Sequence, residues 1–188
     1  MRLIQGFGIN DLQDNRKESK EFSIWHGVIA RCCSKKTKAS DPAYKECFAS
    51  EKFKRYSDFK LWCQNQIGFG FDDWQLDKDI IQKGNKEYHP DKCVFVPREI
   101  NAFLRTRKKC RGLYPIGVTR IKNGNYITQL KVNNKSVFIG KFSTPETAFQ
   151  AYKAAKEQAI KDMANKWKDQ IDPRAYDALM AYQVEITD

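Results

Sequence analysis

The sequence predicts an α+β protein with a helical N-terminal part, a strand–turn–strand–helix unit, and a three-stranded antiparallel sheet packed on one helix. Three observations lead to this prediction. Apolar residues recur at helical spacing before residue 70, turn residues separate short apolar segments in residues 74–142, and an alanine-rich helical pattern follows residue 143. The chain has 188 residues, 41% of them hydrophobic, so it can form one core or two small ones.

The N-terminal part divides into a tail and two helices. Residues 1–20 are interpreted as a polar tail or loosely held extension, because residues 10–20 are almost wholly polar. In residues 21–70, Phe22, Trp25 and Ile29 recur at helical spacing and predict a first helix. A basic loop over residues 34–42 follows. A second helix is expected around residues 56–66, and the glycines at 68 and 70 end it.

Residues 71–108 are interpreted as one unit of strand, turn, strand and helix. The first strand is expected in residues 74–81 and the second in residues 93–96, with a turn at Gly84 and Asn85 between them. Pro97 opens a helix that runs to Leu104, because proline is tolerated in the first helical turn. A basic linker over residues 105–111 ends this unit.

Residues 112–168 predict a second unit, a meander of strands followed by a long helix. Strands are expected at residues 116–121, 126–131 and 136–142, with Asn-Gly and Asn-Asn turns between them. Residues 143–146 have capping-box spacing. Four alanines at positions 148, 151, 155 and 159 form a stripe that permits close packing on a sheet. Residues 171–188 are a short helix, capped by Asp172, and a tail.

The charge distribution points to a polyanion as the partner. The formal net charge is +11, from 22 basic and 15 acidic residues up to residue 110 and 12 basic and 8 acidic residues after it. A spread excess of Lys and Arg is expected of a protein that neutralises phosphates. No apolar run approaches the length of a membrane span, and residues 1–10 lack the core of a signal peptide, so we expect a cytoplasmic protein without a membrane partner.

Six cysteines are scattered along the chain without a C-x-x-C pair. This spacing specifies neither a disulfide framework nor a zinc knuckle. We therefore expect reduced thiols, several of them buried, and no structural zinc.

Residues 76–101 resemble the core of phage HNH endonucleases, often called homing endonucleases, through Leu76–Ile80, Gly84–Lys86, Tyr88–Pro90 and Cys93–Pro97 together with Asn101. The resemblance implies a ββα-metal finger that holds one divalent ion, Mg²⁺ or Mn²⁺, by Asp77 and Asn101. Asp79 is a possible further ligand or orienting group. Such a site keeps open positions for a phosphate oxygen and for the leaving 3′-oxygen.

The position of the general base departs from the family pattern. Family members have a histidine directly after the metal-binding aspartate, and this chain has Lys78. A lysine is a poor base near neutral pH unless desolvation lowers its pKa, so Lys78 is interpreted either as such a base or as a group that stabilises the charged transition state. Tyr88 and His89 are the other candidates for the base.

Residues 112–167 resemble an APETALA-type (ethylene-response-factor) DNA-binding domain through Gly117–Val118, Tyr126, Gly140–Phe142, Thr144–Glu146 and the alanines of the helix. The resemblance implies a three-stranded sheet, backed by one helix, whose open face enters the major groove. Strand alternation directs Val118, Tyr126, Thr128, Leu130, Val137 and Ile139 toward the helix. The residues expected to meet DNA are Thr119, Arg120, Lys122, Gln129, Lys131, Lys135, Phe138 and Lys141.

Together these features predict a metal-dependent DNA endonuclease that nicks or cuts double-stranded DNA and is targeted by its C-terminal domain. We expect a monomer that acts in the cytoplasm, which is the host cytoplasm if a phage encodes it. Two alternatives stay open. One is a catalytically inactive DNA-binding protein on the same scaffold, and the other is a phage protein that inhibits a host factor through its basic surface.

Overall fold

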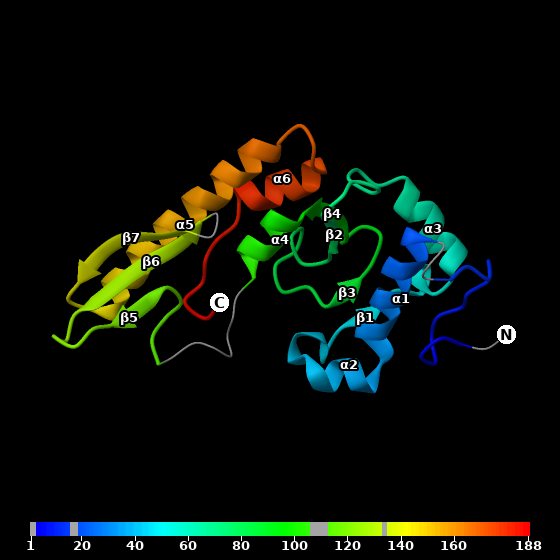
Figure 1. Ribbon diagram of the computed structural model, residues 1–188, viewed down its shortest axis with the longest axis horizontal. Coiled ribbons are helices and arrows are strands. Elements are labelled where there is room, and N and C mark those ends of the chain that lie inside the picture. Colours follow the sequence, from blue (N-terminus) through cyan, green and yellow to red (C-terminus); the bar gives the residue numbers. More distant parts are fainter. Residues whose placement is uncertain (1–2, 16–18, 106–112, 133–134) are drawn as a thin grey trace. The chain divides into compact units, whose positions relative to one another are not determined.

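The computed structural model describes residues 3–15, 19–105, 113–132 and 135–188 (Figure 1). It confirms the α+β fold class, with a helical N-terminal part and an antiparallel sheet packed on a long helix. The helices are α1 (Lys20–Cys33), α2 (Lys35–Ser40), α3 (Tyr56–Gln64), α4 (Arg98–Leu104), α5 (Pro145–Trp167) and α6 (Pro173–Met180). The strands are β1 (Phe48–Ala49), β2 (Trp74–Asp77), β3 (Glu87–Tyr88), β4 (Val94–Pro97), β5 (Val118–Arg120), β6 (Tyr126–Val132) and β7 (Lys135–Phe142), and 3-10 turns lie at Pro42–Tyr44 and Glu51–Phe53.

The chain forms two compact units. Unit 1 comprises Met1–Arg98 and Asp169–Ala178, and unit 2 comprises Glu99–Lys168 and Leu179–Asp188. The structure thus divides the chain after Arg98, whereas the sequence predicted a boundary after residue 108, and residues 106–112 lie outside the described part. The reason is that α4 belongs with the long helix of unit 2 and not with the strands before it.

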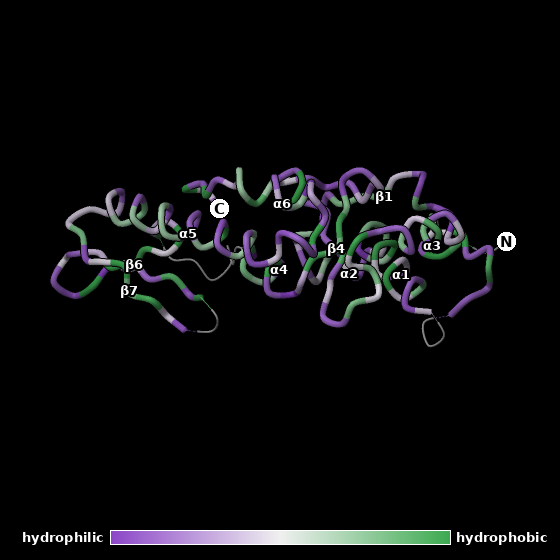
Figure 2. The backbone as a smooth tube through the Cα atoms, turned by 90° about the horizontal axis from the view of Figure 1, so that it is seen from above, coloured by the Kyte–Doolittle hydropathy of each residue, from purple (hydrophilic) through white to green (hydrophobic). Residues whose placement is uncertain are grey.

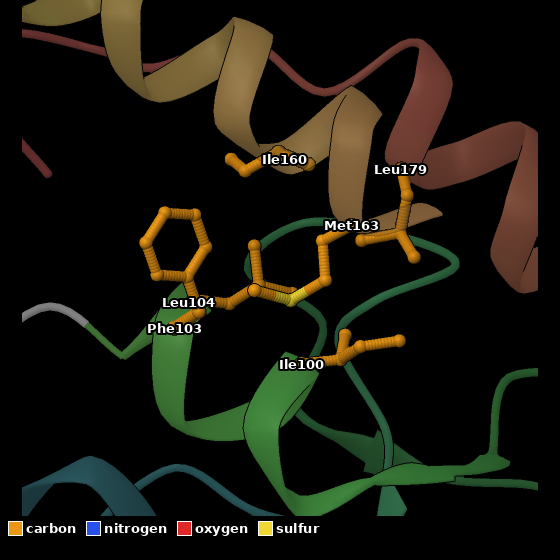
Figure 3. Close-up of a pocket in the computed structure, with 6 residues that line it drawn as sticks. All are labelled: Ile100, Phe103, Leu104, Ile160, Met163 and Leu179. Carbon is orange, nitrogen blue, oxygen red and sulfur yellow. The ribbon is translucent and has the colours of Figure 1, made fainter. Parts of the chain in front are cut away.

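Contacts between α4 and α5 explain this division. Ile100, Phe103 and Leu104 of α4 face Ile160 and Met163 of α5 across an apolar crevice that Leu179 completes (Figure 3). Glu99 forms an ion pair with Lys166 and also accepts a hydrogen bond from the indole N–H of Trp167. The ammonium group of Lys156 donates to the carbonyl of Phe103 and lies over its ring. The crevice leaves no room for a water molecule, so it is a packing contact.

An aromatic core holds unit 1 together. Trp25, Phe53, Tyr56 and Phe59 have no exposed surface, and the indole N–H of Trp25 donates to the carbonyl of Phe53 over 2.7 Å. Burial of such side chains is the largest favourable term in folding. The predicted helices at residues 21–33 and 56–66 supply most of these residues, which confirms both helices. The five described cysteines are free, and four of them are buried.

The N-terminal segment is not the loose tail that its polarity predicted. Ile9 pairs with Arg55, and the Asp11 carboxylate accepts the backbone N–H of Ser57 over 3.0 Å and its hydroxyl over 2.6 Å. The N-cap residue of α3 is Arg55, which makes no capping hydrogen bond with its side chain. A distant aspartate therefore satisfies the first turn of α3 and fixes residues 3–15 on unit 1.

The predicted basic loop at residues 34–42 is also wrong, because residues 35–40 form α2. Ser34 ends α1 through its backbone N–H, which donates to Ala30, and begins α2 through its hydroxyl, which accepts the N–H of Thr37 over 3.3 Å. One serine thus serves two helices.

The sheet of unit 2 has the order β5-β6-β7, all antiparallel. The turn at Gly124, which has φ of +86°, confirms one predicted hairpin, and the other predicted turn, at residues 133–134, lies outside the described residues. The first strand is shorter than predicted. Hydrophilic and hydrophobic residues follow one another along β6 and β7 (Figure 2). A β-bulge interrupts the pairing of these strands between Thr128 and Gln129.

Helix α5 covers one face of this sheet. Val118 and Leu130 pack with Ala148, Phe149 and Tyr152 of the helix. Tyr126 and Ile139 pack against the same cluster and Thr128 is fully buried, as alternation predicted, but Val137 is 51% exposed. Thr144 caps α5 by accepting the N–H of Thr147, one residue later than the predicted capping box, and Asp172 caps α6 as expected.

Candidate functional site

The face of the β5-β6-β7 sheet opposite α5 is the first candidate site, and we call it the outer face. Register defines its members, because directly paired residues of antiparallel strands point to the same side. Thr119 pairs with Ile127, which pairs with Lys141; Gln129 pairs with Phe138; Lys131 pairs with Ser136. The outer face therefore consists of Thr119, Ile127, Gln129, Lys131, Ser136, Phe138 and Lys141, and all except Ile127 are exposed.

Three further basic residues lie at the rim of this sheet. Arg120 and Lys135 pair with residues that pack toward α5, but both are exposed, and Lys122 is exposed in the turn after β5. Of the described acidic residues, none forms an ion pair with these three or with Lys131 or Lys141. The sheet thus presents five cations to solvent, and all eight residues predicted to meet DNA are exposed.

The sequence around the sheet contains a long basic segment, which is not visible when charges are counted separately up to and after residue 110. Residues 100–145 contain ten Lys or Arg, five in residues 105–111 and five in residues 120–141, and no Asp or Glu. Lysines and arginines without neighbouring carboxylates keep their full attraction for phosphates. Counting acidic residues over a short window would have identified this segment as the longest one in the chain without a carboxylate side chain.

Asp77, at the end of β2, is the centre of the second candidate site. Its Oδ1 atom accepts the backbone N–H groups of Asp79 over 2.8 Å and Ile80 over 2.9 Å. These bonds turn the chain and end the strand four residues earlier than predicted. Burial, and secondarily the charge of Asp79, raise the pKa of the Asp77 carboxyl to about 6.

Lys78 points into unit 1 and closes the loop after β2. Its side chain is buried, and the ammonium donates to the backbone carbonyl of Asn85 over 2.8 Å and pairs with Asp79 over 3.1 Å. In return, the Asn85 side chain donates to the Lys78 carbonyl over 2.7 Å and to that of Glu87 over 2.7 Å. Two of the three ammonium donors are thus occupied in holding the loop, which is a structural role that the sequence did not predict.

Tyr88 lies in the core of unit 1. It is 4% exposed, and its hydroxyl interacts with the side chain of Arg31. Burial raises the pKa of this phenol further above its ordinary value. A phenol that stays protonated near neutral pH cannot accept a proton from water, so this environment argues against Tyr88 as the general base.

His89 begins the turn that leads into β4. Its Nδ1 atom accepts the backbone N–H of Asp91 over 3.1 Å, and the carbonyl of His89 accepts from Lys92 and Cys93. When Nδ1 accepts a hydrogen bond, the neutral ring carries its proton on Nε2. In this tautomer Nε2 is a hydrogen-bond donor rather than a base.

The two predicted metal ligands belong to different units. Asp77 lies in unit 1, whereas Asn101 lies in α4 of unit 2. Within the described ranges, no three His, Cys, Asp or Glu side chains gather as metal ligands. The predicted ligands are only one aspartate and one asparagine, so this result does not test them, and they stay a prediction.

Comparison with known proteins returned no matching family model, no matching curated protein and no matching solved structure. None of the described helices combines the length and the hydropathy that crossing a membrane requires.

Proposed function

We propose that this protein binds double-stranded DNA through the outer face of the β5-β6-β7 sheet. The observation that carries this proposal is the set of five exposed cations on and around that face, without an acidic ion-pair partner among the described residues. Phosphates are the natural partner of such a surface, because their neutralisation releases condensed counterions.

The shape of the sheet favours duplex DNA as the polyanion. The major groove, about 12 Å wide, admits a β-ribbon, and its base edges distinguish all four base pairs. The outer face offers both kinds of contact that a specific complex needs. Lysines position the protein on phosphates, and Gln129, Thr119 and Phe138 are able to reach base edges.

Binding of a fluorescein-labelled duplex, followed by anisotropy, tests this proposal directly. We expect micromolar or tighter affinity at low salt, and a steep loss as salt is added. A labelled acidic peptide is the control, with a net charge of −11 that is equal and opposite to the charge of the protein. Measured under the same conditions, it separates recognition of the duplex from attraction to any polyanion. Equal affinity for peptide and duplex would remove the basis of the proposal.

We also propose that unit 1 contributes metal-dependent hydrolysis of the DNA backbone. The observation that favours it is the carboxylate of the half-buried Asp77 at the end of β2, beside Asp79 and followed along the chain by β4 and α4. Burial, and secondarily the charge of Asp79, raise the pKa of Asp77, and a positive charge beside this carboxyl pair would favour the ionised form. A hard divalent cation would supply that charge.

The residues would then take separate roles. Asp77 would hold the ion, with Asp79 orienting the site, and the ion would polarise the phosphodiester and lower the pKa of its water. His89 would donate through Nε2 to a phosphate oxygen. Lys78 would keep the loop after Asp77 in place, so that the carboxylate stays positioned.

Conversion of supercoiled plasmid to nicked or linear DNA, with Mg²⁺ or Mn²⁺, tests the nuclease proposal. Asp77→Asn is the sharpest variant, because its amide oxygen still accepts the N–H groups of Asp79 and Ile80 and so preserves the turn. We expect loss of cleavage in this variant and in the presence of chelator, with duplex binding retained.

Cleavage that persists in Asp77→Asn would refute the assignment of the ligand. Salt-sensitive binding without cleavage of plasmid or genomic DNA would make the protein a binding module that lacks the chemistry. Tight binding to a host protein, with little affinity for DNA, would favour an inhibitor of a host factor. As the working proposal, the protein acts in the cytoplasm as a monomer.

A further inference from the structure

An aromatic ring stands in the middle of the outer face. Phe138 is 62% exposed, although it lies on a strand whose neighbours contribute to a hydrophobic core. Exposure of a large apolar side chain forgoes the stabilisation that burial would give. Its place among lysines calls for an explanation in terms of a ligand.

The β-bulge is what brings this ring and Lys141 to the same face. The two residues are three positions apart on β7, so in a regular strand they would point to opposite sides of the sheet. Pairing shifts by one residue between Thr128 and Gln129, and so Lys141 faces outward opposite Ile127 while Phe138 faces outward opposite Gln129. Bulges of this kind re-aim side chains near functional sites.

The surroundings of Phe138 have the layout of a groove reader. Gln129 lies directly opposite, which places the two side chains about 5 Å apart at their Cβ atoms. Lys131 lies at one end of the face and Lys141, opposite Ile127, at the other. Ile127 and Lys131 are four residues apart on β6, which is about 13 Å along the strand. This spacing matches the major groove, which is about 12 Å wide, so each lysine has a phosphate strand within reach while the centre meets the bases.

Phe138 and Gln129 form the central pair of the outer face, and their chemistry indicates which base pair this face would read. A phenyl ring neither donates nor accepts hydrogen bonds, and the one apolar group that the major groove displays is the C5-methyl of thymine. A glutamine amide matches the N6 donor and N7 acceptor of adenine. Guanine is read mainly by arginine or by lysine; the described residues of the outer face include no arginine, and the two lysines lie at its ends rather than beside the central pair.

We propose that the outer face recognises A·T base pairs in the major groove, with Phe138 against thymine methyl groups and Gln129 on an adjacent adenine. This inference rests on the proposed DNA-binding function of the sheet, and it adds the class of target sequence. Phosphate binding alone does not require an aromatic side chain, whereas recognition of thymine gives the ring of Phe138 a role.

Replacement of thymine by uracil tests the inference, because uracil lacks only the methyl group. The experiment uses the full-length protein and two alternating duplexes, one of adenine with thymine and one of adenine with deoxyuridine. We expect wild type to prefer the thymine duplex by about four-fold for each methyl group that it contacts, the value of about one buried methyl or methylene group. In Phe138→Ala this preference falls to one, while the salt dependence of binding is unchanged.

Val137→Ala is the matched control. Val137 is a neighbouring exposed apolar residue, but its register partner Leu130 faces α5, so its removal should leave the preference for thymine intact. A second arm uses 7-deazaadenine, which lacks the N7 acceptor, and we expect the resulting loss of affinity to disappear in Gln129→Ala.

The outcomes separate this inference from the proposal beneath it. Salt-sensitive duplex binding with equal affinity for thymine and uracil would overturn the A·T inference and leave DNA binding in place. Stronger binding to single-stranded DNA than to duplex would also overturn it, because Phe138 would then stack on unpaired bases. Absence of salt-sensitive binding to every duplex would refute the DNA-binding function itself.

Discussion

Removal of Lys131 and Lys141 provides a quantitative test of the outer face as the DNA-binding surface. The two lysines lie at opposite ends of this face, both are exposed, and neither forms an ion pair with a described acidic residue. Substitution by alanine therefore removes two charges from the surface without leaving a carboxylate unpaired. Loss of stability is expected to be small.

The magnitude follows from counterion release. Each phosphate that a cation neutralises contributes about −0.9 to the slope of log K against log salt concentration, so five contacts give a slope of about −4.5. Between about 50 and 200 mM salt, the wild type should then lose about 500-fold in affinity. The double variant Lys131→Ala, Lys141→Ala keeps three contacts, has a slope of about −2.7, and should lose about 40-fold over the same range.

Fluorescence anisotropy with one labelled duplex, titrated at five or more salt concentrations, measures both slopes. The matched control is Lys36→Ala, Lys161→Ala, which changes the net charge equally at positions on α2 and α5 rather than on the sheet. An unchanged slope in the sheet variant would show that the outer face does not contact phosphates. An equal change in the control would show that net charge alone is responsible.

Two predictions concern stability. Gly117 has φ of +76°, and a Cβ atom there would lie 2.1 Å from the ring of Tyr152, so Gly117→Ala should destabilise unit 2 by about 2–4 kcal/mol in urea denaturation. Gly124→Ala, at φ of +86° in open space, should cost about 1 kcal/mol, and equal losses would refute the packing argument. At Asp172, burial opposes ionisation, but hydrogen bonds from Arg174 prevail and lower the pKa of this carboxyl. Its contribution to stability is present above about pH 4 and is lost as pH falls through the lowered pKa. Asp172→Asn should therefore reduce the loss of stability at acid pH, which is measured as the urea midpoint from pH 3 to 7. The same loss in the variant as in the wild type would contradict a role of Asp172 in this pH dependence.

Periodicity predicted the parts of the fold in which each helix or strand follows its own local pattern. The two aromatic-rich helices, the strands of the meander and the alanine-rich helix all lie where apolar spacing placed them. The N-terminal segment could not be predicted in this way, because the partners of Asp11 lie on α3, far along the chain. The place of α4 was missed for the same reason, since its apolar side chains are matched by those of α5.

The candidate site shows the same division. Alternation correctly placed Gln129, Lys131 and Phe138 on one face of the sheet, but it could not foresee the bulge, which changes the face of every residue beyond it. At the second site, the residue types around Asp77 suggested chemistry, yet the direction of the Lys78 side chain depends on the carbonyl of Asn85. Such a contact depends on the path of a loop, which no local spacing encodes.

The bulge also makes it possible to change the shape of the outer face with little change in its composition. The extra residue in β7 is Ile139, and a bulge increases the local right-handed twist of its strand. Deletion of Ile139 would restore an uninterrupted ladder in which Phe138 still faces Gln129 and Gly140 still faces Thr128, with the loss of one partly buried side chain. Every other side chain would keep its partner, and the ribbon would become flatter. A duplex groove winds around its axis, so this shortened chain would reveal how much of the affinity depends on curvature alone.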